Sequence, residues 1–287
     1  MTAPKACPSL LSCDRGLHCR IMIDTHCHLT FPDFAGRVDA VMRDAAACGV
    51  SGAITVATTT ADALSALELA RSRTDVWCSA GVHPLYAEEA VNFEHYLNVI
   101  RDERCVAWGE LGLDNHYSDP PRKIQDAVLA DQLALIRDSG IEKPIIVHCR
   151  DAFDELISAL RTSGISGDRF VFHCFTGTAD NARQVLDFGA WISFTGVVTF
   201  KRKSEHIQEA ARLVPDDRIM IETDAPFLTP EPHRKIRPNE PKYSIDTARF
   251  VAELRQEPWD AFHRTINANT EKFFGIDVGA AEAAIGG

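Results

Sequence analysis

The sequence predicts an α/β protein folded as a single (β/α)8 barrel, the TIM barrel, with a metal site at the carboxyl ends of its strands. Three observations lead to this expectation. From residue 21 onward, eight short apolar or β-branched runs alternate with longer amphipathic segments. Titratable residues stand at the ends of most of these runs. The length of 287 residues suits one barrel of this kind.

The predicted strands span residues 21–25, 52–57, 76–81, 106–110, 144–148, 170–173, 191–194 and 218–222. Seven helical segments are expected between them. In one, residues 125–136, apolar residues recur at helical spacing. A helical tail is expected at residues 245–254 and 259–274. An open doubly wound sheet would be favoured by a Gly-rich turn after the first strand, but His26-Cys27-His28-Leu29 stands there.

The domain organisation follows from an absence of linkers. No Pro/Gly-rich segment or shift in composition divides the chain, so residues 21–276 are expected to form one barrel domain. Residues 1–20 are expected to be a disordered extension, with Met22 as a candidate initiator. The Ala-rich end, residues 277–287, is expected to fray.

Composition limits the kinds of partner. A formal net charge of -11 repels polyanions at long range, which argues against a broad basic face that wraps duplex DNA. Bound divalent cations can still supply positive charge locally, where a phosphate would sit. Nine cysteines, an odd number spread over a large chain, indicate buried thiols in a reducing compartment. No apolar stretch reaches the length of a membrane span, so a cytoplasmic location is expected, without membrane or obligatory protein partners.

Histidines and carboxylates gather at one end of the predicted barrel. A single histidine or acid at a strand end most often has a structural role, as a hydrogen-bonded residue or a helix cap. Here five of the eleven histidines stand at strand ends, together with two acids. They are His26, His28, His83, His148, His173, Glu110 and Asp224.

Burying so many of these groups together is unfavourable unless something pairs them, and a divalent metal is the simplest partner. His26 and His28, two apart on an extended backbone, point the same way and can bind one ion. His148 and His173 can bind another, and either Glu110 or Asp224 can bridge the two ions. A hydrogen-bonded histidine cluster without metal is the alternative, but imidazole and carboxylate are the ligands that catalytic metal sites prefer.

The order of these residues resembles the amidohydrolase superfamily, and within it the TatD deoxyribonuclease family. Six segments carry the resemblance, in order, between about residue 21 and about residue 274. They are Asp24-Thr25-His26-Cys27-His28-Leu29, Gly81-Val82-His83-Pro84, Gly109-Glu110-Leu111-Gly112-Leu113-Asp114, His148-Cys149-Arg150-Asp151-Ala152, His173-Cys174-Phe175-Thr176-Gly177 and Glu222-Thr223-Asp224-Ala225-Pro226-Phe227-Leu228.

The resemblance implies a deoxyribonuclease that hydrolyses DNA phosphodiester bonds with a water activated by two divalent ions, expected to be an exonuclease for single strands or strand ends. It implies that the first ion is held by His26, His28, Glu110 and Asp224. The second would be held by Glu110, His148 and His173. The ligand set does not distinguish Mg²⁺, Mn²⁺ and Zn²⁺.

The chemistry of such sites suggests further roles, each with an alternative. Asp224 is the candidate general base, or else only a ligand. His83 is the candidate contact for the phosphate or the leaving oxygen, or else a residue that orients Glu110. Glu110 is the third candidate catalytic residue, beside Asp224 and His83.

Arg150 and Arg234 are the candidate phosphate contacts, with Lys235 and Arg237 nearby in sequence. In the last loop the chain departs from the compact basic-Asn-Glu-Pro run of the family, because Ile236 and Pro238 interrupt it.

Two other functions fit the same residues. The same ion pair can hydrolyse an amide, a lactone or an ester such as that of an aminoacyl-tRNA. A non-catalytic metal-binding protein is the more distant alternative. The loss of one of the six candidate ligand residues would favour it, but all six are present in the sequence.

Overall fold

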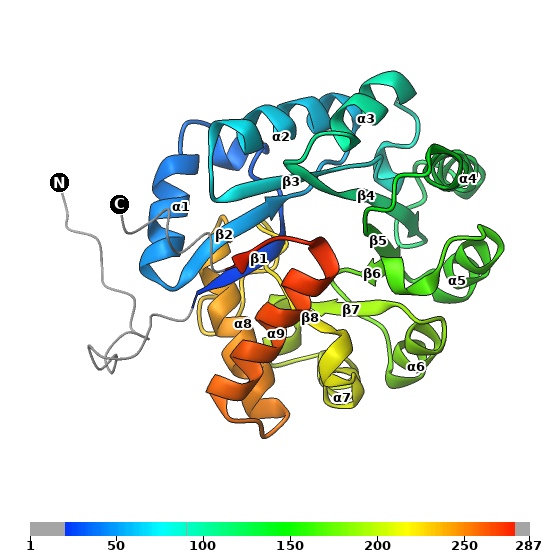
Figure 1. The fold of residues 1–287 in the computed structure, drawn as a ribbon. Coiled ribbons are helices and arrows are strands. Elements are labelled where there is room, and N and C mark those ends of the chain that lie inside the picture. The colour runs from blue at the N-terminus through cyan, green and yellow to red at the C-terminus, as the bar shows by residue number, and fades with distance from the viewer. Residues whose placement is uncertain (1–20, 90, 279–287) are drawn as a thin grey trace.

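The computed structural model describes residues 21–89 and 91–278, and Figure 1 shows them as a ring of strands surrounded by helices. Within this part of the chain, eight strands form one sheet in chain order, each parallel to the next. The strands are β1 Met22–Cys27, β2 Val50–Thr55, β3 Val76–Ala80, β4 Cys105–Asp114, β5 Ile145–Arg150, β6 Phe170–Phe172, β7 Trp191–Phe194 and β8 Ile219–Ile221. The predicted (β/α)8 barrel is confirmed.

One helix follows each of the first seven strands and packs on the outside of the ring (Figure 1). These helices are α1 Val38–Ala47, α2 Thr60–Ser72, α3 Phe93–Ile100, α4 Arg122–Ser139, α5 Phe153–Thr162, α6 Ala179–Asp187 and α7 Glu205–Leu213. After β8 come α8 Ser244–Leu254 and α9 Trp259–Phe274. In α4, which contains the predicted segment 125–136, Leu129, Leu133 and Ile136 are buried at helical spacing.

The seam between β8 and β1 is closed mainly by contacts beyond the regular strand ladder. In the described residues the two sides share one isolated bridge, between Cys27 and Ala225. The carboxylate of Asp24 accepts hydrogen bonds from the backbone N–H (2.9 Å) and the hydroxyl of Thr223. The hydroxyl of Thr25 donates to the carbonyl of Ile221 at 3.2 Å.

The amino-terminal end of the barrel is filled with apolar side chains. Ile23, Ile146 and Met220 from the strands cluster with Phe273 and Phe274 at the end of α9, all at most 9% exposed. Figure 1 looks onto this end, with α9 in front of the barrel. Because this end is filled, we expect any ligand site to lie at the opposite end of the barrel, at the carboxyl ends of the strands.

Two predicted boundaries were wrong. The fourth strand was expected to stop at residue 110 but continues to Asp114, since β4 keeps pairing with β5 from Leu111 to Asp114. Gly112 permits this pairing, because its φ is +152° and a Cβ there would lie 1.9 Å from the carbonyl oxygen of His148. The expected frayed tail begins too early, because Val278 is 3% exposed and packs in the apolar cluster. The expectations for residues 1–20 and 279–287 lie outside the described residues.

Among the described residues, the helices include none that is long and apolar enough to cross a membrane.

We expect Phe274→Ala to lower the free energy of unfolding by about 3–5 kcal/mol, because the substitution leaves a cavity in the closed end of the barrel. Denaturant titration followed by circular dichroism measures this change. Phe93→Ala is the control, since Phe93 is 37% exposed and should lose well under half as much. Equal losses in the two variants would contradict the role assigned to α9.

Candidate metal centre

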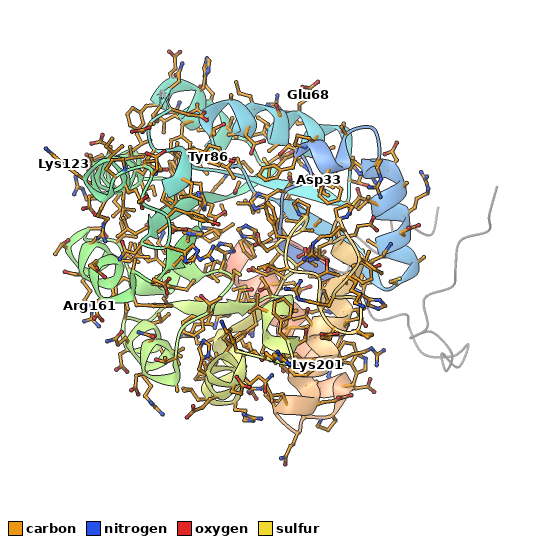
Figure 2. The ribbon with its side chains drawn as sticks, turned by 180° about the vertical axis from the view of Figure 1, so that it is seen from behind. Asp33, Glu68, Tyr86, Lys123, Arg161 and Lys201 are labelled. Carbon is orange, nitrogen blue, oxygen red and sulfur yellow. The ribbon has the colours of Figure 1, made fainter. Side chains whose placement is uncertain are left out.

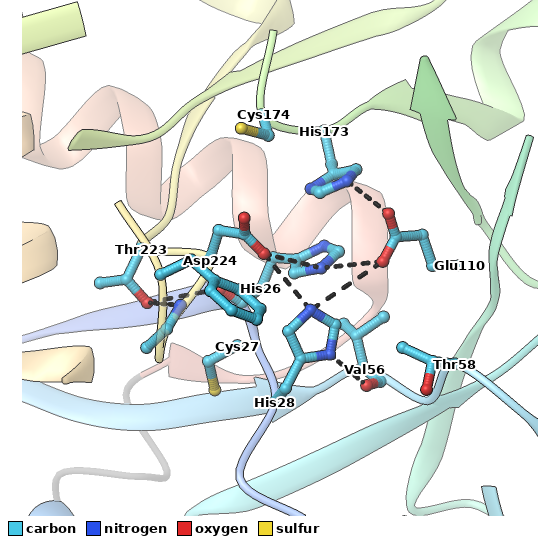
Figure 3. A network of polar contacts seen from close by, with 12 residues as sticks. His26, Cys27, His28, Val56, Thr58, Glu110, His173, Cys174, Thr223 and Asp224 are labelled. Atoms are coloured by element: carbon cyan, nitrogen blue, oxygen red, sulfur yellow. Dashed lines mark hydrogen bonds and ion pairs between the residues drawn. The ribbon is translucent and has the colours of Figure 1, made fainter. Parts of the chain in front are cut away.

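The six predicted metal ligands converge at the carboxyl end of the barrel, as Figure 3 shows for most of them. They come from β1, β4 and β5 and from the segments that directly follow β1, β6 and β8. All lie in or near a buried cluster, and the most exposed of their side chains are those of His148 and Asp224, at 16% and 14%. The six residues are His26, His28, Glu110, His148, His173 and Asp224.

Glu110 lies at the centre of the cluster with its side chain 2% exposed. Its Oε2 atom faces the first histidine pair, 3.4 Å from His26 Nε2 and 4.0 Å from His28 Nε2. Its Oε1 atom faces the second pair, 2.6 Å from His173 Nε2 and 2.9 Å from His148 Nδ1. Each carboxylate oxygen therefore serves one histidine pair, which is the arrangement that a bridging ligand requires.

Asp224 lies with the first histidine pair. Its Oδ1 atom is 3.3 Å from His28 Nε2 and 3.7 Å from His26 Nε2. The backbone explains this placement, because the N–H of Asp224 donates to the carbonyl of His26 and the N–H of His28 donates to that of Ala225. The segment after β8 thus runs beside the end of β1 and brings the carboxylate to the two imidazoles.

Three of the four ligand histidines have their rings oriented by a second partner. His28 Nδ1 donates to the carbonyl of Val56 (2.8 Å), which leaves Nε2 to face the carboxylates of Asp224 and Glu110. His148 Nε2 is 3.0 Å from Asp114 Oδ2, and His173 Nδ1 is 3.2 Å from Glu222 Oε1. Metal-binding histidines usually have such a partner on the nitrogen that does not bind the metal.

Asp114 and Glu222 were missed as functional residues at the sequence level. Both belong to the strand-end segments already singled out, and that was the available signal. Burial alone would raise the pKa of Asp114, but hydrogen bonds from His148 and the backbone N–H of Tyr117 lower it to about 2. The carboxylate is therefore ionised and holds the His148 ring.

The fourth ligand histidine, His26, indicates that the cluster is built for a metal. Its ring is fully buried, and neither nitrogen has a hydrogen-bond partner. The ring stacks on His173, with centroids 3.8 Å apart. A buried imidazole nitrogen without a hydrogen bond is costly, and a cation between Nε2 and the carboxylates of Glu110 (3.4 Å) and Asp224 (3.7 Å) would give Nε2 a partner.

The donor set also fits metal ions by its spacing. Three groups of side chains, each offering ligand atoms within 4.8 Å of one another, overlap at the centre of the cluster. These groups are His26 with His28 and Glu110, His26 with His173 and Asp224, and His83 with Glu110 and His148.

The pKa shifts show how the cluster balances its charge. Burial alone would raise the pKa of Glu110, but His173, His83 and His148 hold it well below its usual range. Burial alone would lower the pKa of His173, which Glu110 and Glu222 instead raise well above its usual value. Protons on the imidazoles thus offset the carboxylates here, and a divalent ion can replace those protons.

His83 lies against the second histidine pair. Its Nε2 atom is 3.1 Å from His148 Nδ1 and 3.5 Å from Glu110 Oε1. Its Nδ1 atom accepts a hydrogen bond from the N–H of Leu85, so the proton is on Nε2. Burial and the neighbouring His148 lower the pKa of His83 to about 3, so the ring is neutral. His83 hydrogen-bonds to His148 and Leu85, and both roles expected for it, contact with the substrate and orientation of Glu110, stay predictions.

The candidate phosphate contacts lie outside the cluster. Arg150 ends β5 and is exposed, with its guanidinium carbon 5.4 Å from the centroid of the Tyr117 ring. The guanidinium of Arg234 stacks on Phe200, 3.9 Å from the ring centroid. Arg237 instead holds its own loop together, because its Nη1 donates to the Thr229 hydroxyl (3.0 Å) and the Ile236 carbonyl (3.1 Å).

Two aromatic residues beside His28 were not predicted as functional. Phe31 stacks on His28, with centroids 4.7 Å apart. Phe227 lies 6.1 Å from Phe31 and 6.4 Å from His28 and is 49% exposed. An exposed aromatic ring at the edge of a polar cluster offers a stacking surface to a planar ligand.

The chain matches known proteins over most of its length. The family model described as TatD related DNase matches residues 23–275. The chain is 36% identical over 259 residues to the uncharacterized metal-dependent hydrolase YcfH of Escherichia coli K12, covering 89% of this chain and 96% of that protein. It is 32% identical over 262 residues to the 3'-5' ssDNA/RNA exonuclease TatD of Klebsiella pneumoniae strain 342, covering 90% and 99%.

A solved structure also matches over most of its length. The crystal structure of YJJV, a TatD homologue from Escherichia coli K12, superposes with a TM-score of 0.82 at 29% identity, covering 89% of this chain and 98% of that one.

We expect Asp114→Asn to weaken metal binding about 10- to 100-fold, because the amide keeps an acceptor for His148 but loses the charge that makes the imidazole a better ligand. Titration calorimetry with Mn²⁺ measures the affinity. Asp131→Asn is the matched control, since Asp131 is exposed on α4. An affinity for Asp114→Asn equal to that of the control would show that Asp114 does not support the metal centre.

Proposed function

Because the chain belongs to the TatD related DNase family of metal-dependent hydrolases, we propose that it hydrolyses phosphodiester bonds in DNA, as an exonuclease for single strands or strand ends. The relative from Klebsiella pneumoniae, which carries the name 3'-5' ssDNA/RNA exonuclease, supports a nucleic-acid substrate. The division of the two Glu110 oxygens between two histidine pairs is the observation that carries the proposal.

We propose that two divalent ions are bound. His26, His28, Glu110 and Asp224 would hold the first, and Glu110, His148 and His173 the second. Such ions supply Lewis-acid polarisation of a phosphate oxygen and make a water molecule more acidic. Mg²⁺, Mn²⁺ and Zn²⁺ all suit this mixed set of nitrogen and oxygen donors.

Asp224 is our candidate for the group that takes the proton of the attacking water. Burial alone would raise its pKa, but His28 and the other imidazoles lower it, so the carboxylate is ionised. Its side chain is 14% exposed, whereas that of Glu110 is 2% exposed and already faces both histidine pairs. Asp224 is therefore the more accessible of the two carboxylates to a water molecule and a phosphate.

His83 and two arginines are our candidates for holding the substrate. Burial and the neighbouring His148 lower the pKa of His83 to about 3, so the ring is neutral, and its Nε2–H would hydrogen-bond to a phosphate oxygen or the leaving oxygen rather than transfer a proton. Arg150, in register with Asp114 on the next strand, and Arg234 are proposed to contact phosphates beside the centre.

The exposed aromatic ring of Phe227 favours a nucleic-acid substrate over other hydrolysable bonds. Hydrolysis of an amide or a lactone needs no stacking surface, whereas a nucleobase gains from one. A non-catalytic binding role, the other expectation from the sequence, is set aside because the family consists of hydrolases.

We expect Glu110→Ala to abolish cleavage, because the substitution removes the carboxylate whose two oxygens face the two histidine pairs. End-labelled single- and double-stranded oligonucleotides, incubated with Mg²⁺, Mn²⁺, Zn²⁺ or a chelator, measure the activity. Glu68→Ala is the matched control, since Glu68 is exposed on the outer helix α2 (Figure 2). Cleavage that resists the chelator, or full activity in Glu110→Ala, would refute the proposal. Turnover of a lactone or aminoacyl ester without nuclease activity would redirect it to another bond.

We expect Phe227→Ala to raise the KM for an oligonucleotide about tenfold, because stacking on an aromatic ring contributes about 1–3 kcal/mol per base. Phe227→Trp should keep the wild-type KM, which separates the loss of stacking from a general disturbance of the loop. Steady-state kinetics on one labelled oligonucleotide compare the three proteins. An unchanged KM in Phe227→Ala would show that no base stacks there.

A further inference from the structure

The loops that follow β7 and β8 form one unit beside the metal centre. The N–H of Glu231 in the second loop donates to the Thr199 hydroxyl in the first, at 2.8 Å. The backbones touch at Gly196, where a Cβ would lie 2.2 Å from the carbonyl oxygen of Leu228. Arg234 of the second loop stacks on Phe200 of the first. Both loops leave carboxyl ends of neighbouring strands, so they lie at the same end of the barrel as Asp224.

Positive charge gathers on these two loops. Lys201, Arg202 and Lys203 are consecutive and exposed, and Arg234 and exposed Lys235 stand on the adjoining loop. We call these five residues the basic groove. Lys201, Arg234 and Lys235 line a cavity of about 450 Å³ together with Glu231, Pro232, His233 and Ile236, and Arg202 and Lys203 directly follow Lys201 in the chain.

The charges that face the basic groove leave it positive. Glu231 is the acid in the cavity lining, and the His233 side chain there lies 3.5 Å from Asp246. The chain as a whole has a net charge of -11, whereas these two short segments together carry five cationic side chains. Figure 2 looks onto the carboxyl end of the barrel and shows Lys201 on this face.

We propose that the basic groove binds the sugar-phosphate backbone of a single-stranded nucleic acid, beyond the nucleotide that is cleaved. The inference rests on the proposed function and adds to it the path of the uncleaved strand. Continuity of the chain supports the path, since one loop runs from Asp224 at the metal centre past exposed Phe227 to Arg234 and Lys235. Cations along a groove, next to an aromatic ring, are what single-stranded nucleic acids bind without sequence preference.

The negative charge of the rest of the molecule supports this choice of occupant. A chain of net charge -11 repels a polyanion at long range. The electrostatic attraction for its phosphates is therefore expected to be strongest at a locally positive groove. A free phosphate ion would need only one cation, whereas the five cations of the groove suit several phosphates in succession.

The test compares a short and a long substrate, decathymidylate and the dinucleotide of thymidine. The triple variant K201Q/R202Q/K235Q removes three exposed charges from the groove. The matched control R43Q/K123Q/R264Q removes three exposed charges from α1, α4 and α9, so both variants carry the same net charge. Equal thermal unfolding of the two variants checks that both are folded.

We expect the groove variant to raise the KM for decathymidylate about tenfold and to affect the dinucleotide less than threefold. The slope of log(kcat/KM) against log[salt] for decathymidylate should flatten by about 0.7 for each phosphate that the groove variant no longer binds. The control should keep the wild-type difference between the two substrates. Equal effects on both substrates, or equal effects of both variants, would overturn the basic groove.

Binding of fluorescein-labelled decathymidylate, measured by anisotropy with a chelator present, separates this inference from the proposed function. If the wild type cleaves neither substrate, the proposed nuclease activity fails. In that case weaker binding by the groove variant than by the control still supports the groove, and equal binding overturns it as well.

Discussion

The carboxylate of Glu110, 2% exposed and facing two histidine pairs, is the constraint on which the rest of the structure depends. A buried charge of this kind is tolerable only when partners surround it. Those partners come from β1 and its end, from β5 and from the end of β6, while Glu110 stands on β4. In an open sheet with the same strand order, β1 would be an edge strand far from β6. Only a closed barrel lets His26 stack on His173 while both contact the same carboxylate.

Closure of the barrel is also what completes the ligand set. The seam between β8 and β1 has little regular pairing, and the buried carboxyl of Asp24 bonds across it to Thr223. Burial raises the pKa of Asp24 to about 8, despite those hydrogen bonds. Beyond this point the backbones of His26 and Asp224 pair directly. The pairing that closes the barrel and the pairing that delivers Asp224 to the first histidine pair are thus continuous.

The sequence was enough to predict the barrel and the convergence of six candidate ligands, because strand periodicity and strand-end chemistry are local signals. It was not enough for residues whose role depends on register. Asp114 reaches His148 only because Gly112 lets β4 run four residues past Glu110 against β5. Arg237 stands near the candidate phosphate contacts in sequence, but in the fold its guanidinium hydrogen-bonds to its own loop. The place of Phe227 beside His28 likewise follows from the path of the loop after β8.

The distribution of charge bears on how an acidic protein could bind a polyanion. Most of the surface repels nucleic acid at long range, and in the proposed function attraction is confined to the metal centre and the basic groove. In that proposal, cleavage would leave a mononucleotide without a connection to the groove, held only by the metal centre. The net negative charge would then favour its departure, while the rest of the strand would stay bound through several phosphates. Substrate retention and product release would then be separate without any movement of the barrel.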